Sequence, residues 1–168
     1  MRKVITTLFL TAFISGMSFA QVGAKIGYID SNKILTEMPQ TDSLSKELKN
    51  YADYLDQQMQ TMGQEYQKKV QDYQQNVAGM SDLIRQTKEK EITDLQQRIQ
   101  AFQASADQDL QNKQQELFNP LIQQVKDAIT AVGKENGYNY ILDVGTGAVV
   151  YYEGDDIFPL VKKKLGIK

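Results

Sequence analysis

The chain has 168 residues, of which 41% are hydrophobic and 24% charged, and it contains no Cys, His or Trp. This length allows one modest domain, or a small core with an extended part. The missing Cys and His exclude the usual zinc site, a Cys–His or Ser–His–Asp nucleophile and a disulfide. A formal charge of -2 is too balanced for a protein that binds nucleic acid through clustered Lys and Arg.

Residues 1–20 predict a secretory signal peptide. Arg2 and Lys3 give a positive start, residues 4–14 form an apolar stretch, and Ser18 and Ala20 frame a small-residue cleavage site. A membrane anchor is the alternative, but this stretch spans only about half of a ~30 Å hydrocarbon core. We therefore expect export with cleavage after Ala20, which leaves 17 basic and 21 acidic residues.

Residues 41–132 predict a long helical arm. Apolar residues from Leu44 to Val77 recur in steps of 4, 3 and 4, and a second run from Ile84 to Val132 has similar spacing. An eleven-residue repeat averages about 3.67 residues per turn, which gives a nearly straight helix with a narrow apolar stripe. Each stripe needs a partner, so the two runs are expected to pack against each other.

The break between the two runs decides how they pack. Gly79 offers a flexible point, and Ser81 with Asp82 can cap a new helix. We therefore expect an antiparallel hairpin, with one uninterrupted rod as the alternative. Thr41 and Asp42 are expected to cap the first helix, and Pro120 to kink or interrupt the second.

Residues 21–40 and 133–168, on either side of the arm, indicate a β-rich head. The predicted strands, the last two joined by a Gly-containing hairpin loop, are Lys25–Asp30, Tyr138–Asp143 and Ala148–Tyr152. A helix is expected at Asp156–Leu165. The sequence thus predicts an α+β fold: a small β-sheet head that forms an oligomeric core, with the helical hairpin inserted between head strands.

Oligomerisation is expected because the predicted strands carry consecutive apolar residues, so both faces of the sheet are apolar. The head is also close to the lower size limit for an independent core. Burial of one sheet face between subunits would cover its apolar residues and would also enlarge the core of the small head. The residues expected at this interface are Ile26, Tyr28, Ile29, Ile141, Leu142, Val149, Val150 and Tyr151.

Other motifs indicate chemistry only weakly. Gly145–Gly147 lacks the pattern of a phosphate loop and is read as a turn. Asp155 and Asp156 are read as a helix cap rather than a calcium site. Asp30 and Asp143 each end a predicted strand. They are interpreted as turn formers, with a pair of catalytic carboxylates as the alternative. Residues 162–164 are three lysines, which form a solvated face or touch anionic lipid. We expect no catalytic residue, no cofactor and no metal.

Several short motifs follow one another along the mature chain: Ile26-Gly27-Tyr28-Ile29-Asp30-Ser31, Ile34-Leu35, Glu37, Pro39, Pro120, Ile122, Gly137-Tyr138, Ile141-Leu142-Asp143 and Asp156-Ile157. In this order the chain resembles the Skp/OmpH family of periplasmic chaperones. The resemblance implies a homotrimer whose heads share a β-core and whose three hairpins surround a cavity. It also implies that unfolded outer-membrane β-barrel proteins are held there without ATP. The best-known members are strongly basic, and the acidic balance of this chain argues against lipopolysaccharide binding.

Two functions are therefore compared. The first is a holdase chaperone, whose thin arms enclose an unfolded client through many weak contacts. The second is a structural spacer or adaptor of the cell envelope, whose hairpin tip binds one defined partner. Methionine adapts to irregular apolar surfaces, and the arm residues expected to contact a client are Met59, Met62, Tyr66, Tyr73, Met80 and Phe102.

Overall fold

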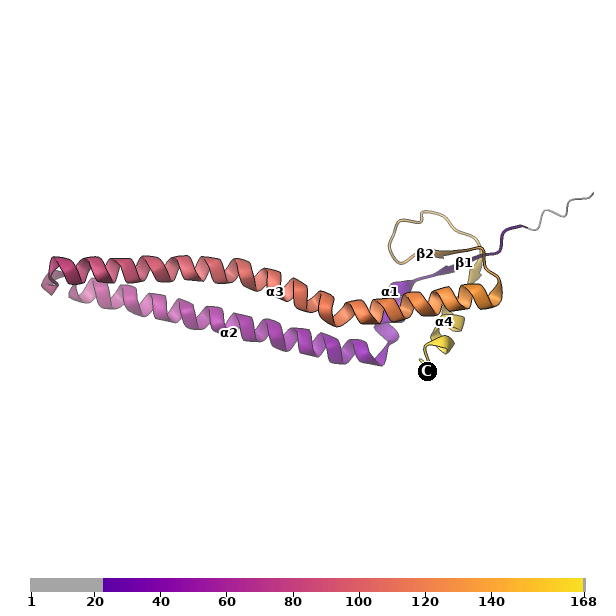
Figure 1. Ribbon diagram of the computed structural model, residues 1–168, viewed down its shortest axis with the longest axis horizontal. Helices are drawn as coiled ribbons and strands as arrows, with labels where there is room; N and C mark the ends of the chain where they lie inside the picture. The colour runs from indigo at the N-terminus through magenta and orange to yellow at the C-terminus, as the bar shows by residue number, and fades with distance from the viewer. Residues whose placement is uncertain (1–22, 168) are drawn as a thin grey trace, which may run out of the picture.

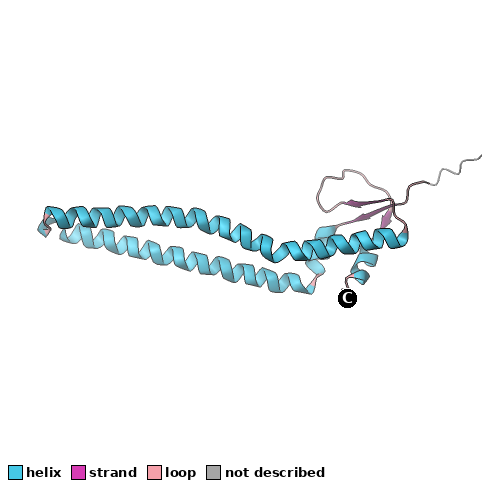
Figure 2. Cartoon of the chain, in the orientation of Figure 1, coloured by secondary structure: helices cyan, strands magenta, loops and turns pink. Residues whose placement is uncertain are grey.

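The computed structural model describes residues 23–167, which form a small head and a long helical hairpin (Figure 1). The elements in chain order are β1 (Ile26–Ile29), α1 (Ser31–Glu37), α2 (Pro39–Asn76), the 3₁₀ turn η1 (Val77–Gly79), α3 (Asp82–Asn136), β2 (Tyr140–Asp143), β3 (Asp155–Asp156) and α4 (Phe158–Lys164). Helices dominate the described chain (Figure 2). The predicted α+β class with an inserted hairpin is confirmed. The predicted signal peptide, residues 1–20, lies outside the described residues.

The arm consists of α2 and the longer part of α3, which run side by side in opposite directions (Figure 1). α2 has 38 residues and therefore extends about 57 Å. η1 reverses the chain, and the Ser81 hydroxyl then accepts a hydrogen bond from the Ile84 N–H at 3.4 Å. The hairpin and the cap at Ser81 are as predicted, and the uninterrupted rod is excluded.

One predicted helix feature is wrong, and a second is correct only in part. α2 begins at Pro39, because proline has a helical φ and suits the first turn, where no N–H partner is needed. The hydroxyl of Thr41 donates to the Leu35 carbonyl instead of capping the helix. Pro120 lies within α3 without interrupting it, although the axis of α3 bends between the arm and the head (Figure 1).

The sheet of the head is parallel, in the order β2-β1-β3. The predicted strand at Ala148–Tyr152 is wrong, since these residues belong to an irregular loop. The chain turns at residues 144–147 and crosses to the far side of β1, where Asp155 and Asp156 pair with Gly27 and Tyr28. A parallel arrangement requires such a crossing, whereas a tight hairpin would have made the strands antiparallel.

One face of the sheet packs against α1, α4 and the last turns of α3. The parallel register places Gly27, Ile29 and Ile141 on this face. The contact is close, because a Cβ on Gly133 of α3 would lie 2.9 Å from Ile141. The buried core consists of Ile29, Ile34, Met38, Leu121, Val125, Ala128, Val132, Ile157 and Val161. The end of the segment assigned to the arm by sequence therefore supplies four core residues of the head.

Among residues 23–167, the loop at residues 144–154 lies on the opposite side of the sheet, away from α3 (Figure 1). Strand alternation places Ile26, Tyr28, Tyr140 and Leu142 on this face. The Tyr152 ring of the loop lies 4.7 Å from the Tyr28 ring, measured between centroids. We call this the outer face of the head.

Candidate functional site

The six predicted client-contact residues of the arm are all partly buried, so each still exposes some of its surface; they are Met59, Met62, Tyr66, Tyr73, Met80 and Phe102. Met59 lies at the seam between the two helices, whereas Met80 lies in the turn between η1 and α3. α2 has no buried residue among those described. A two-helix arm thus leaves its apolar stripe open along one edge.

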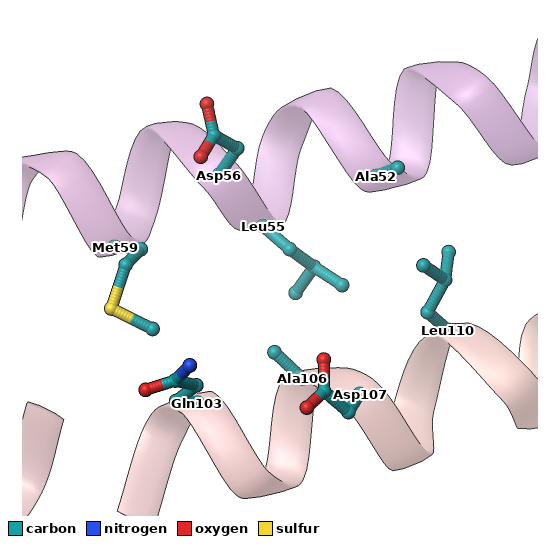
Figure 3. Close-up of a pocket in the computed structure, with 8 residues that line it drawn as sticks. All are labelled: Ala52, Leu55, Asp56, Met59, Gln103, Ala106, Asp107 and Leu110. Atoms are coloured by element: carbon teal, nitrogen blue, oxygen red, sulfur yellow. The ribbon is translucent and has the colours of Figure 1, made fainter. Parts of the chain in front are cut away.

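A groove opens in the middle of the seam, where Met59 is one of the lining residues (Figure 3). Its volume is about 260 Å³. The other lining residues are Ala52, Leu55 and Asp56 of α2, and Gln103, Ala106, Asp107 and Leu110 of α3. The two alanines leave space that a larger side chain would fill. We call this feature the mid-arm groove.

Polar contacts join the two helices on either side of the mid-arm groove. Near the head, the Lys113 ammonium lies 3.2 Å from the Glu47 carboxylate. Towards the tip, the Lys69 ammonium lies 2.9 Å from the Glu91 carboxylate, which raises the pKa of Lys69 and lowers that of Glu91. The Tyr73 hydroxyl donates to Glu89, and this hydrogen bond raises the pKa of Tyr73.

Four basic residues near the tip lie close to carboxylates. Lys69, Arg85, Lys88 and Lys90 each lie within 4 Å of a carboxylate, at distances between 2.7 and 3.6 Å. Lys69 and Lys88 share the carboxylate of Glu91, so these four positive charges face three carboxylates.

Three exposed apolar residues of the arm were missed by the sequence analysis. Leu83 is 75% exposed, Ile84 50% and Tyr54 55%. Ile84 begins the second apolar run, but so close to the tip that α2 no longer covers it. Leu83 and Tyr54 do not belong to the apolar stripe. The only sequence signals for them were that Leu83 precedes the stripe residue Ile84 and that Tyr54 follows the stripe residue Tyr51 by three positions.

The head residues predicted for oligomerisation fall into two groups. Ile29 is fully buried in the core of its own chain, and Ile141 faces α3. Val150 is 98% exposed and Tyr151 75%. The remaining four are partly buried: Ile26, Tyr28, Leu142 and Val149.

Two further aromatic residues extend the outer face of the head and were not selected from sequence. Tyr140 on β2 is 64% exposed, and Tyr152 in the loop is 41% exposed. β2 is also an edge strand, so its outward backbone groups are open to pairing. The outer face is therefore rich in apolar surface for a domain of this size.

The carboxylates of Asp30 and Asp143 serve local structure. Asp30 accepts from the N–H groups of Asn32 and Lys33 and caps α1. Asp143 accepts from the Ser31 N–H at 3.2 Å, the Ser31 hydroxyl at 2.5 Å and the Gly145 N–H at 3.1 Å. Both residues thus act as turn formers. The Asp156 carboxylate likewise accepts from the Phe158 N–H at 2.9 Å, but the N-cap position of α4 is Ile157, one residue later than predicted.

Within residues 23–167, no group of three or more acidic side chains is placed to hold a metal ion. In the same part of the chain, every helix is too short or too polar to cross a membrane.

Comparison with known proteins gives one matching family and relatives that share one name. Residues 25–165 match the family described as outer membrane protein (OmpH-like). The chain is 25% identical over 150 residues to the chaperone protein Skp of Pectobacterium atrosepticum, covering 89% of this chain and 91% of that protein. It is 24% identical over 166 residues to the chaperone protein Skp of Photorhabdus luminescens, covering 98% and 99% respectively.

Proposed function

Because the chain belongs to the OmpH-like outer membrane protein family, we propose that it is a chaperone that holds unfolded outer-membrane proteins. It would bind them in the periplasm without ATP and prevent their aggregation before membrane insertion. The match over residues 25–165 and the two relatives named as chaperones support this role. The observation that carries it is the long hairpin with an apolar seam that its own two helices cover only in part.

The arm suits a client without a fixed shape. Burying part of one methionine or tyrosine side chain contributes on the order of 1 kcal/mol, so no single contact holds the client. Many such contacts act on one tethered chain, and their effects combine through high local concentration. The proposed contact surface comprises the six partly buried arm residues and the more exposed Tyr54, Leu83 and Ile84.

The heads are proposed to join three copies. The outer face of the sheet, with Tyr140, Val150, Tyr151 and Tyr152 exposed, provides the apolar surface for this contact. Ile29 and Ile141 are excluded from it because they pack within their own chain. Three arms would then border a shared cavity, which a single arm cannot enclose.

Export is proposed from the signal peptide at residues 1–20, with cleavage after Ala20 and a periplasmic location for the mature chain. By sequence the arm is residues 41–132 and the head is residues 21–40 with 133–168, and the last turns of this arm segment, from Leu121 to Val132, pack in the head core.

The range of clients tests this proposal. Several unrelated outer-membrane β-barrel proteins are diluted from urea into buffer with and without the mature protein, and aggregation is followed by light scattering in the absence of ATP. We expect suppression for all of them. An envelope spacer or adaptor would leave all of them to aggregate and would instead bind one folded partner.

A further inference from the structure

The charge of the arm is uneven along its length. The two segments that face each other around the mid-arm groove, residues 50–62 and 99–112, contain no Lys or Arg and four aspartates, namely Asp53, Asp56, Asp107 and Asp109. Two of the basic residues that flank these segments are paired: Lys49 with Asp53 at 2.8 Å, and Lys113 with Glu47 at 3.2 Å. A third, Arg98, lines a separate pocket towards the tip, together with Glu65, Glu91 and Asp94. This middle part of the arm is therefore locally acidic.

Two of these aspartates line the mid-arm groove, one from each helix. Asp56 accepts a hydrogen bond from the Gln60 side chain at 2.7 Å. Neither Asp56 nor Asp107 forms an ion pair among the described residues. Both side chains are exposed, so the carboxylates are accessible from solution.

The floor between these carboxylates is apolar. Leu55, Met59 and Leu110 point into the space between the helices, with the small Ala106 opposite Leu55 (Figure 3). The groove volume of about 260 Å³ is much larger than the ~30 Å³ that one water occupies in the liquid. A flexible side chain with several methylene groups therefore fits.

Lysine and arginine combine these two requirements, because they bury an aliphatic stem along apolar surface and keep the charged end in water. We propose that the mid-arm groove binds lysine and arginine side chains of an extended, unfolded client segment, with the stem on the floor and the charge beside Asp56 and Asp107. The argument is charge complementarity in a groove of about 260 Å³ with an apolar floor. This inference rests on the proposed chaperone function and specifies which parts of a client the arm prefers.

The test uses the mature protein and fluorescein-labelled unstructured peptides that alternate Lys with Ser, Gly and Leu. A matched peptide carries Gln in place of each Lys. Affinity is measured by fluorescence anisotropy at low ionic strength, about 50 mM salt, where exposed charges are weakly screened. We expect the Lys peptide to bind more tightly than the Gln peptide, and this preference to shrink as salt is raised.

The decisive variant is Asp56→Asn with Asp107→Asn, which keeps side-chain size and leaves an amide oxygen to accept from Gln60. Exposed ion pairs contribute modestly, so we expect the double variant to bind the Lys peptide about three- to tenfold more weakly and the Gln peptide unchanged. The matched control, Asp72→Asn with Asp109→Asn, removes the same charge from positions outside the groove. It is expected to leave Lys-peptide binding within about twofold of wild type.

A second variant addresses the floor. Ala106→Leu fills the groove and is expected to weaken binding of both peptides while retaining the helical circular dichroism signal. Equal Lys-peptide affinities for wild type and the Asp56/Asp107 variant, or an equal loss in the control variant, would overturn the proposal. So would a change in assembly mass in the Ala106→Leu protein, because the groove would then be an interface between copies.

Aggregation assays separate this inference from the proposed function. If the wild-type protein keeps unfolded β-barrel proteins soluble and the peptides show no Lys preference, the inference fails and the chaperone role stands. If the wild-type protein does not suppress aggregation at all, the proposed function itself fails.

Discussion

Gly154 lets the head loop approach the backbone of β1. Its φ is 153°, and a Cβ placed there would lie 2.4 Å from the Ile26 carbonyl oxygen. That oxygen belongs to a paired strand and cannot move aside as the end of a side chain would. Gly147, in the same loop, has a φ of 72° and open space around it. A side chain at Gly154 would therefore suffer both backbone strain and a steric collision, whereas a side chain at Gly147 would suffer backbone strain alone.

We predict that Gly154→Ala destabilises the protein by at least about 2 kcal/mol, through strain and collision together. Gly147→Ala, with strain alone, should cost about 1–2 kcal/mol. The measurement is urea unfolding followed by circular dichroism at one fixed protein concentration, since the proposed assembly would make stability concentration-dependent. Equal stabilities for the two variants would show that the loop moves freely away from β1.

Single residues differed in how well the sequence predicted them. Ser81 caps α3 as expected, because it precedes a clear helical run and follows a turn. Asp156 instead lies in β3, one residue before Ile157, the N-cap of α4. Thr41 was misread because Pro39 starts α2 two residues earlier. Exposure was harder to predict: Leu83 and Tyr54 lie next to the apolar stripe, and sequence spacing alone does not show how far the partner helix reaches.

At the scale of the elements, the arm depends on very few fully buried side chains. Leu95 of α3 has 0% exposure, whereas the other described arm residues up to Leu117 are at least partly exposed. The hairpin is therefore held by one tightly packed position, a half-buried stripe and cross-helix ion pairs.

We predict that Leu95→Ala destabilises the arm by about 2–5 kcal/mol, as expected for a fully buried leucine. Leu83→Ala is the control on the same helix. Because Leu83 is 75% exposed, its truncation should change stability by less than about 0.5 kcal/mol. Thermal unfolding monitored by helical circular dichroism compares the two, and similar melting temperatures would contradict this account of the seam.

The ion pair near the tip predicts a pH effect. The pKa of Glu91 lies below its usual value of 4.5, mainly because Lys69 donates a hydrogen bond to it. The unfolded chain therefore binds this proton at higher pH than the folded chain does. The contribution of the pair is present above the ordinary glutamate pKa and is lost as the pH falls through the lowered value.

We expect the wild-type arm to lose more stability than Glu91→Gln when the pH is lowered from about 6 to about 3. Glu65→Gln controls for removal of one nearby glutamate. The readout is the melting temperature at each pH. A Glu91→Gln protein with the same pH dependence as wild type would show that the contact with Lys69 is not maintained in solution.

The elements differed in predictability for a physical reason. An eleven-residue repeat extends over many turns, so the hairpin was determined by a long, redundant pattern. The segment Ala148–Tyr152 offered only a short apolar run, which by itself does not distinguish a strand from a loop. The apolar stripe of α3 is continuous in sequence, so it does not show where α3 stops packing against α2 and begins to pack in the head core.

At the scale of the whole molecule, the outer face of the head is the surface proposed for assembly. Val150 is 98% exposed in the chain, so a charged residue at this position is compatible with the fold of one subunit. In the proposed assembly, an unpaired carboxylate at the same position would be buried and would cost several kcal/mol at each interface.

We therefore predict that Val150→Asp dissociates the assembly into folded single chains. Leu83→Asp places the same charge on an exposed arm residue and should leave the mass unchanged. Multi-angle light scattering gives the mass of each protein, with circular dichroism as the check on folding. An unchanged mass for Val150→Asp would remove this residue from the interface.

At the scale of the whole molecule, composition predicted which kinds of chemistry are excluded, and the order of the motifs predicted the family. The missing Cys and His narrowed the possible chemistry, and the family resemblance is confirmed by the match over residues 25–165. The mid-arm groove could not be predicted, because it depends on which residues of α3 lie opposite Ala52 and Asp56. That register is set by the turn at the tip and by packing along the whole arm.

Native mass spectrometry of the mature protein mixed with one unfolded outer-membrane β-barrel protein tests the central claim most directly. The client is diluted from urea into the protein without ATP, and the soluble species are weighed. We predict a complex with the mass of three copies and one client. The account would be contradicted if the protein were recovered without client while the β-barrel protein aggregated.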